Sequence, residues 1–126
     1  MTTRRPRNTH KDENHGIVTD FMKYGCGGFT VAPKELRGDS IAYTANYKGY
    51  KFVAIDCANY GGVLVDWLVM CTDNGNTTWI EVKTPEAYAA KEHSVTPGEA
   101  WLMMTTGLVE VAVTVEDVQA IFEGML

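Results

Sequence analysis

The stretch that decides the fold runs from residue 63 to residue 83 and reads VLVDWLVMCTDNGNTTWIEVK. Its first part, residues 63–71, is apolar on both faces, which is typical of a strand buried inside a sheet. The dipeptide Asn74-Gly75 then favours a type I′ turn, because both positions tolerate a positive φ. We therefore predict a β-hairpin with strands at 63–71 and 77–83 at the centre of the domain.

Asp66 lies inside the most apolar part of this hairpin. An isolated ionised carboxylate there costs several kcal/mol, so it needs a cation or a proton. If Asn74-Gly75 is a two-residue loop, the register places Lys83 directly opposite Asp66 and Glu81 at the diagonal position. All three side chains then point to one face, whereas a three-residue or five-residue loop would move Asp66 to the other face.

Two carboxylates and an amine on adjacent strands suit metal-assisted phosphodiester cleavage. Asp66 and Glu81, with the carbonyl of Val82, offer the hard oxygen ligands that Mg²⁺ prefers. The ion would neutralise the phosphate and acidify a bound water, while Lys83 would orient that water or stabilise developing charge. The alternative is a buried Asp66–Lys83 salt bridge that serves packing alone, with Glu81 incidental. Spacing by itself leaves both interpretations open.

The rest of the chain adds helices and further strands around the hairpin. Apolar periodicity and turn residues predict helices at 12–24, from 96 to 105 and at 115–124, and strands at 26–31, 40–47, 50–57 and 108–113. The order helix, strands, helix, strand, helix predicts a single α/β domain in which helices flank a mixed sheet.

Composition and charge indicate one ordinary globular domain with an unusual amino-terminal end. The chain has 126 residues, is 45% hydrophobic and 21% charged, and carries a formal net charge of −5, which excludes a strongly basic nucleic-acid coat. Residues 1–11 nevertheless hold four bases and no acid, namely Arg4, Arg5, Arg7 and Lys11. We expect a flexible basic arm at 1–10 that reaches phosphates, ahead of a domain at 11–126. A solvated, frayed terminus is the alternative.

Several classes of protein are not indicated. The three cysteines are widely spaced and form no CxxC pair, so we predict buried thiols in a reducing compartment, without a zinc ribbon or a disulfide framework. Neither a secretory signal nor an apolar run of membrane-spanning length is visible. We therefore expect a cytoplasmic protein without a membrane partner. The sequence also lacks a glycine-rich nucleotide loop, so no organic cofactor is predicted.

Asp66, followed after fourteen residues by Glu81-Val82-Lys83, resembles the core motif of the PD-(D/E)XK nuclease superfamily. The wider layout, with a helix opening at residues 12–15 and another near Glu99, is similar to small phage VRR-NUC-type nucleases, which resemble Holliday junction resolvases. The resemblance spans roughly residues 11–122. It departs from the family pattern at Val65, where the family has Pro, at Glu99, where Gln is usual, and in the longer stretch 33–59.

This resemblance implies a restriction-endonuclease-like core and a DNA endonuclease that uses Mg²⁺, with Mn²⁺ as a substitute. It gives catalytic roles to Asp66, Glu81 and Lys83, and metal contacts to Asp66, Glu81 and the Val82 carbonyl. It also gives the acid of the first helix to Glu13, with Asn14 next. Branched or junction DNA is the implied substrate, and cutting both strands of a symmetric junction would favour a homodimer. The host cytoplasm is the implied location if a phage encodes the chain. The alternative is a catalytically inactive nucleic-acid-binding or assembly module with the same fold.

Overall fold

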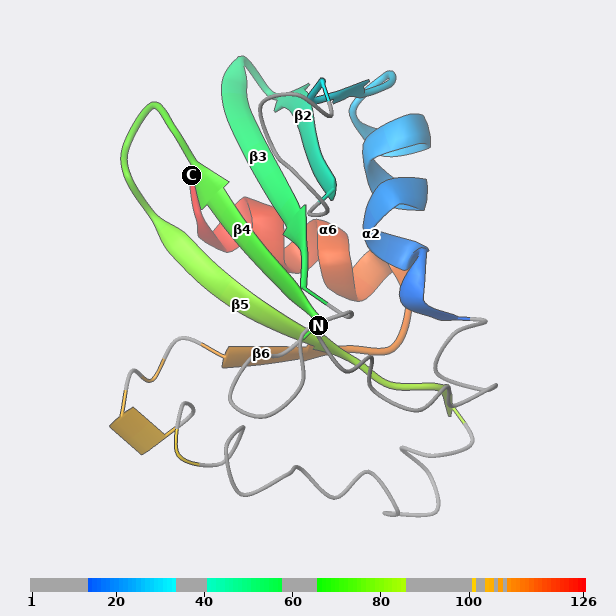
Figure 1. Cartoon of the computed structure of the whole chain (residues 1–126), viewed down its shortest axis with the longest axis vertical. Helices are drawn as coiled ribbons and strands as arrows, with labels where there is room; N and C mark the ends of the chain where they lie inside the picture. The colour runs from blue at the N-terminus through cyan, green and yellow to red at the C-terminus, as the bar shows by residue number, and fades with distance from the viewer. Residues whose placement is uncertain are drawn as a thin grey trace.

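Six strands form one mixed sheet within the residues that the computed structural model describes, which are 14–33, 41–57, 66–85, 101, 104, 105, 107 and 109–126 (Figure 1). The strands lie in chain order. Each of the first four strands runs antiparallel to the next, and the sixth runs parallel to the fifth. The predicted mixed α/β sheet is therefore confirmed in this coarse form. The strands are β1 (Thr30–Val31), β2 (Ile41–Tyr47), β3 (Tyr50–Asp56), β4 (Trp67–Cys71), β5 (Thr77–Val82) and β6 (Val109–Ala112).

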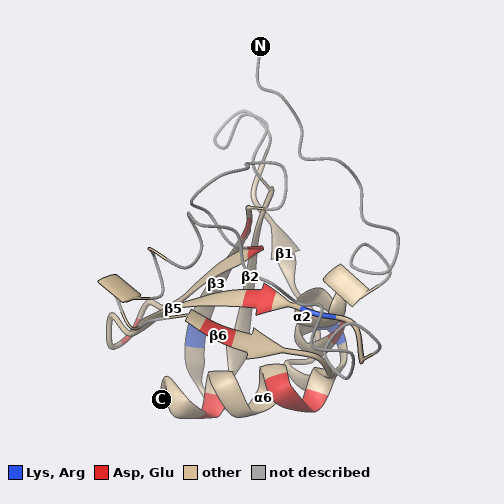
Figure 2. Cartoon of the chain, turned by 90° about the horizontal axis from the view of Figure 1, so that it is seen from below, with Lys and Arg blue, Asp and Glu red and all other residues tan. Residues whose placement is uncertain are grey.

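The described helices cover one face of this sheet (Figure 2). The short helix α2 (Ile17–Asp20) continues directly into the π-helix η1 (Phe21–Gly25), and α6 (Val115–Gly124) follows β6. Thr114 begins α6 with a capping box, in which its hydroxyl accepts a hydrogen bond from the Asp117 N–H at 3.1 Å. The helix expected from residue 96 falls largely outside the described residues. Among those described, no helix is long and apolar enough to cross a membrane.

The hydrophobic core fills the space between the two helical segments and the sheet. Alternate residues of the strands point to it, so Phe52 and Ala54 of β3 are buried beside Val69 of β4. Phe122 of α6 stacks on Phe52 with ring centroids 4.5 Å apart, and Phe21 of η1 meets Phe122 edge-on at 4.8 Å. These aromatic contacts join both helical segments to the strands and fix which face of the sheet is internal.

The β4–β5 hairpin differs from the predicted register by two residues. Its turn spans four residues, because the Gly75 N–H donates to the Cys71 carbonyl and Trp67 pairs with Ile80. The expected type I′ turn at Asn74-Gly75 is therefore wrong, and Gly75 alone of that pair has a positive φ, 78°. The predicted pairing of Asp66 with Lys83 is wrong too, because the register extended by one residue places Glu81 opposite Asp66. A shift of two residues keeps every side chain on its expected face.

Long-range contacts hold this four-residue turn. The side-chain amides of Asn74 and Asn76 both donate to the carbonyl of Met125, each at 2.8 Å. The Asp73 carboxylate accepts a hydrogen bond from the Lys51 N–H at 2.7 Å. The tight two-residue turn occurs instead between β2 and β3, where Lys48 and Gly49 have φ angles of 51° and 83°.

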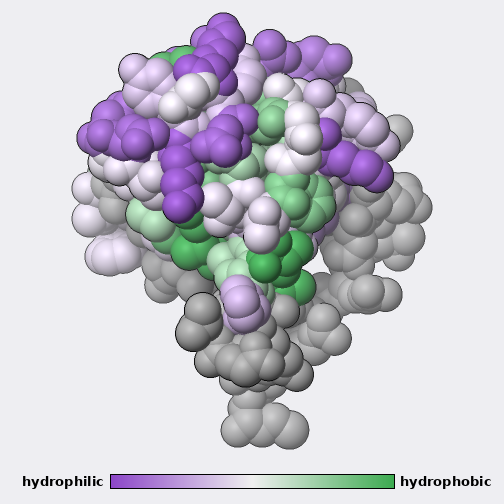
Figure 3. Space-filling view, turned by 90° about the horizontal axis from the view of Figure 1, so that it is seen from above, coloured by the Kyte–Doolittle hydropathy of each residue, from purple (hydrophilic) through white to green (hydrophobic). Residues whose placement is uncertain are grey.

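The surface at this end of the molecule, which carries the β2–β3 turn, mixes hydrophilic and hydrophobic residues (Figure 3). Tyr24 of η1 is the most exposed aromatic residue among those described, at 76%, and Lys23 lies over its ring at 5.2 Å. Phe29 and Val31, at and beside the edge strand β1, are also exposed. Scattered exposed apolar side chains of this kind are normal in a soluble domain and do not by themselves indicate a binding site.

Candidate functional site

Asp66, Glu81 and Lys83 meet where β4 begins and β5 ends. The Cys57 N–H donates to the Asp66 carbonyl at 2.8 Å, so the pairing of β3 with β4 continues through residue 66. Trp67 and Ile80 belong to the core beneath the helices. Because side chains alternate along a strand, the side chains of their neighbours Asp66 and Glu81 project from the opposite face of the sheet. The structure therefore brings the three sequence-predicted residues together on that face.

Asp66 is fully buried and is bonded to the backbone of the neighbouring strand. Its Oδ2 accepts a hydrogen bond from the Val82 N–H at 2.8 Å, and its exposed fraction is 0%. Backbone donors of this kind favour the ionised form of a carboxylate. The N–H and C=O of a strand residue point to the same side. The Val82 carbonyl is therefore directed to the same edge of β5 as the Asp66 carboxylate.

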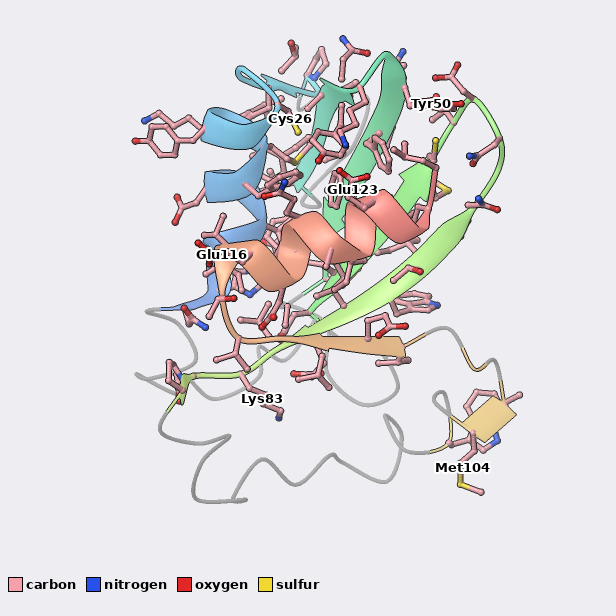
Figure 4. All side chains as sticks on the ribbon, turned by 180° about the vertical axis from the view of Figure 1, so that it is seen from behind. Cys26, Tyr50, Lys83, Met104, Glu116 and Glu123 are labelled. Atoms are coloured by element: carbon pink, nitrogen blue, oxygen red, sulfur yellow. The ribbon has the colours of Figure 1, made fainter. Side chains whose placement is uncertain are left out.

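Glu81 and Lys83 form a loose ion pair in the same place. The Lys83 Nζ lies 3.9 Å from the Glu81 Oε1, and Lys83 and Glu81 are 8% and 1% exposed, respectively. Figure 4 shows Lys83 near the end of β5, with its side chain directed away from α6. Since Asp66 is the direct neighbour of Glu81, two buried acidic groups share one lysine within this trio.

The oxygen atoms at this site are of the type that Mg²⁺ binds. Magnesium is held by one or two carboxylates and keeps several of its waters, so the oxygens of Asp66, Glu81 and the Val82 carbonyl are of the kind that such a site uses. Within the described part of the chain, no group of three or more His, Cys, Asp or Glu side chains is placed to hold a metal ion. Among the described residues, the two carboxylates would therefore be supplemented at a metal by the Val82 carbonyl and water.

Cys57 lies beside this site without adding a reactive group to it. Burial and the neighbouring acids raise the pKa of its thiol to about 11. The thiol is therefore protonated at neutral pH and is neither a nucleophile nor a ready metal ligand. Its role here is structural, because its backbone N–H holds Asp66 in the sheet.

Of the two first-helix residues that the resemblance places near the metal, Glu13 and Asn14, only Asn14 lies among the described residues. Its side-chain amide donates to the carbonyls of Lys83 and Val113, at 2.7 and 2.8 Å. The residue thus contacts the ends of β5 and β6 through their backbones. The remaining sequence-predicted residues, Glu13, the bases of the arm and Glu99, lie outside the described residues. The arm bases are Arg4, Arg5, Arg7 and Lys11.

Sequence reasoning missed a second cluster on the helical face. The His15 Nε2 lies 3.0 Å from the Asp56 Oδ1, and its ring stacks on Trp67 with centroids 5.0 Å apart. The indole Nε1 of Trp67 donates to the His15 carbonyl at 3.2 Å. His15 and Asp56 are distant in the sequence and share no motif spacing, and they meet because β3 pairs Asp56 with Trp67, on which the His15 ring stacks. The cluster anchors the first described helical turn to the strand that follows Asp66.

The acidic residues of α6 lie on the other side of the sheet. This helix contains Glu116, Asp117 and Glu123 and no Lys or Arg (Figure 2). A phosphate backbone is repelled by such a surface.

Comparisons with protein-family models, with curated proteins and with solved structures found no match for this chain. The functional argument consequently rests on the residues and on the geometry described above.

Proposed function

We propose that this protein is a metal-dependent endonuclease that hydrolyses phosphodiester bonds in DNA. The observation that carries the proposal is the buried trio itself. Asp66 and Glu81 are neighbours on adjacent strands, and Lys83 lies 3.9 Å from Glu81. Adjacent buried carboxylates are costly unless cations accompany them, and a divalent ion would add its positive charge to that of Lys83.

Each residue then has a distinct role. Asp66, Glu81 and the Val82 carbonyl would hold Mg²⁺, which supplies Lewis acidity and lowers the pKa of a bound water. The Val82 N–H keeps the Asp66 carboxylate in place beside that carbonyl. Lys83 would hold the attacking water or the non-bridging phosphate oxygen by a charged hydrogen bond.

The strand order supports the proposal at the level of the fold. A helical segment, an antiparallel run through β3, β4 and β5, a parallel β6 and the helix α6 follow one another in that order. The sequence resemblance implies the order helix, strands, helix, strand, helix, of which the second helix falls largely outside the described residues. We propose a restriction-endonuclease-like core of the PD-(D/E)XK type, with the acid pair at the point where β4 and β5 meet.

The competing hypothesis is an inactive nucleic-acid-binding or assembly module in which the trio is only structural. It is favoured by the contact between Lys83 and Glu81, which pairs one acid without any metal. That contact lies at the limit of an ion pair, 3.9 Å, and it leaves Asp66 adjacent to a second carboxylate. We therefore place metal-dependent cleavage first.

Cleavage of a defined set of DNAs tests the proposal. End-labelled four-way junction, flap, nicked and linear duplex substrates would be incubated with Mg²⁺, with Mn²⁺ and with chelator. We expect metal-dependent cleavage of at least one substrate, its loss in Glu81→Gln, and its retention in Glu110→Gln, which neutralises an exposed acid on β6. Binding of these DNAs without cleavage in either metal would instead support the inactive module.

A further inference from the structure

The side-chain nitrogen of Asn14 donates to two backbone carbonyls. This nitrogen has two hydrogens and donates to Lys83 at 2.7 Å and to Val113 at 2.8 Å. Lys83 and Val113 are the residues that follow the last paired positions of β5 and β6, Val82 and Ala112. A single side chain therefore links the two parallel strands at the place where their own ladder ends.

The two strands separate beyond this point. The Val113 N–H donates to the Asp117 carboxylate at 2.8 Å, as part of the cap of α6, and therefore takes no part in the pairing of the strands. The Lys83 N–H still donates to the Ala112 carbonyl at 3.0 Å. The backbone of Lys83 is thus held at its N–H by β6 and at its carbonyl by Asn14. Fixing both groups fixes the direction in which the Lys83 side chain leaves the chain.

The helical turn that carries Asn14 is itself anchored beside Asp66. The neighbouring residue, His15, pairs with Asp56 at 3.0 Å and accepts a hydrogen bond from the Trp67 indole. Trp67 directly follows Asp66. Asn14 thus contacts the strand that carries Lys83, and His15 contacts the strand that carries Asp66. These two consecutive residues of one turn therefore fix the position of Lys83 relative to that of Asp66.

We propose that Asn14 is a positioning residue that sets the location of the Lys83 ammonium group relative to Glu81. It acts through the Lys83 carbonyl and touches neither the substrate nor the metal. The catalytic part of this inference rests on the proposed function, whereas the geometric part does not. Misplacing a catalytic group by about 1 Å can lower a rate by about 100-fold.

The variant Asn14→Asp tests the inference because it keeps the shape of the side chain and removes both donors. Asn14→Ser, which keeps one donor, serves where the aspartate variant does not fold. Asn46→Asp makes the same chemical change at an exposed position of β2 and is the matched control. The measurement is NMR of lysine-labelled protein, in which the Lys83 signal is identified by its loss in Lys83→Arg. We expect the signal of the Lys83 CH₂ group next to Nζ to shift, and its cross-peak to Glu81 to weaken, in the Asn14 variants only.

Kinetics add a second readout where the parent cleaves DNA. We expect the Asn14 variants to lose about tenfold to 100-fold in kcat, with KM and the metal dependence nearly unchanged. An unaltered Lys83 signal in a folded Asn14 variant, or an unaltered kcat, would overturn the inference. A parent that cleaves nothing would refute the proposed function, and the Lys83–Glu81 cross-peak would still decide whether Asn14 positions Lys83.

Discussion

The Asp66 carboxylate is bonded to the Val82 N–H at 2.8 Å, and this joins the first acidic residue of the site to the residue between Glu81 and Lys83. The contact links β4 to β5 at the point where β4 begins. The role of Asp66 as a hydrogen-bond acceptor can be separated from its charge, because the amide oxygen of an asparagine accepts the same hydrogen bond. Substitutions at this position therefore distinguish a metal ligand from a structural acceptor.

The variant Asp66→Asn should fold as stably as the parent in the absence of metal, or more stably. The asparagine retains the acceptor for Val82 and removes the repulsion between Asp66 and Glu81. Asp66→Ala should instead cost about 1–3 kcal/mol, because the buried Val82 N–H loses its partner. Thermal melts with and without Mg²⁺ measure both effects. We expect Mg²⁺ to stabilise the parent only. If Asp66→Asn lost as much stability as Asp66→Ala, the charge would be structural.

Substitution of Lys83 separates catalysis from packing. If Lys83 acts on water or phosphate, Lys83→Ala should lower cleavage by orders of magnitude while Mg²⁺ still binds, and more tightly since a competing charge beside Glu81 is gone. If the trio is structural, the same change should cost about 3–5 kcal/mol without rescue by Mg²⁺. Melting curves and cleavage rates decide between the two. Lys51→Ala, at an exposed position of β3, is the control and should change neither.

Sequence patterns alone predicted those parts of the fold that depend on local chemistry. The helix α6 has the predicted bounds of 115–124, because Thr114 supplies a strong cap. The strands β2 and β3 follow their alternating patterns to within one residue. The strand expected at 26–31 is reduced to Thr30–Val31, because Gly27 and Gly28 adopt positive φ angles and the Gly28 N–H donates to the Met22 carbonyl.

The features that sequence reasoning missed depend on contacts between distant residues. The hairpin turn has four residues because Asn74 and Asn76 bond to Met125, near the carboxyl terminus. With a turn of this length, the register places Glu81 instead of Lys83 opposite Asp66. The link from Asn14 to Lys83 likewise joins the first described turn to β5. No local motif encodes such partners, although the face on which Asp66, Glu81 and Lys83 are based follows from alternation.

A polar cluster on α6 predicts how stability depends on pH. Glu123 accepts hydrogen bonds from Lys48 and from the Tyr47 hydroxyl, and these contacts hold its pKa below the usual 4.5. The same contacts raise the pKa of Tyr47 and of Lys48. The Glu123 contribution is therefore present above pH 4.5 and is lost as the pH falls through the lowered value. The contributions of Tyr47 and Lys48 are lost as the pH rises beyond about 10.

The variant Glu123→Gln tests this pH dependence. Thermal melts across the pH range should show that the variant is less stable than the parent at neutral pH. The difference should shrink at acidic pH, where Glu123 is protonated, and again at strongly alkaline pH. Glu116→Gln, on the exposed side of the same helix, serves as the control. A difference between Glu123→Gln and the parent that stays constant with pH would contradict the assignment.

The basic arm gives a prediction for binding. If Arg4, Arg5 and Arg7 bind phosphates, deletion of residues 1–10 should weaken DNA binding and lower the slope of log affinity against log salt. The slope should fall by about 0.9 for each phosphate that the shortened chain no longer neutralises. Cleavage at saturating substrate should change little. Fluorescence anisotropy at several salt concentrations measures the slope, and an unchanged slope would show that the arm binds no phosphate.

The Mg²⁺ dependence of single-turnover cleavage tests the central claim most directly, with the parent compared to Glu81→Gln and Glu110→Gln on one labelled DNA. The account predicts a rate that rises with Mg²⁺ to a plateau for the parent and for Glu110→Gln. For Glu81→Gln it predicts a rate lower by orders of magnitude, because the buried site then has only one of its two carboxylates. No cleavage by the parent at any Mg²⁺ concentration, or an equal rate in Glu81→Gln, would contradict it.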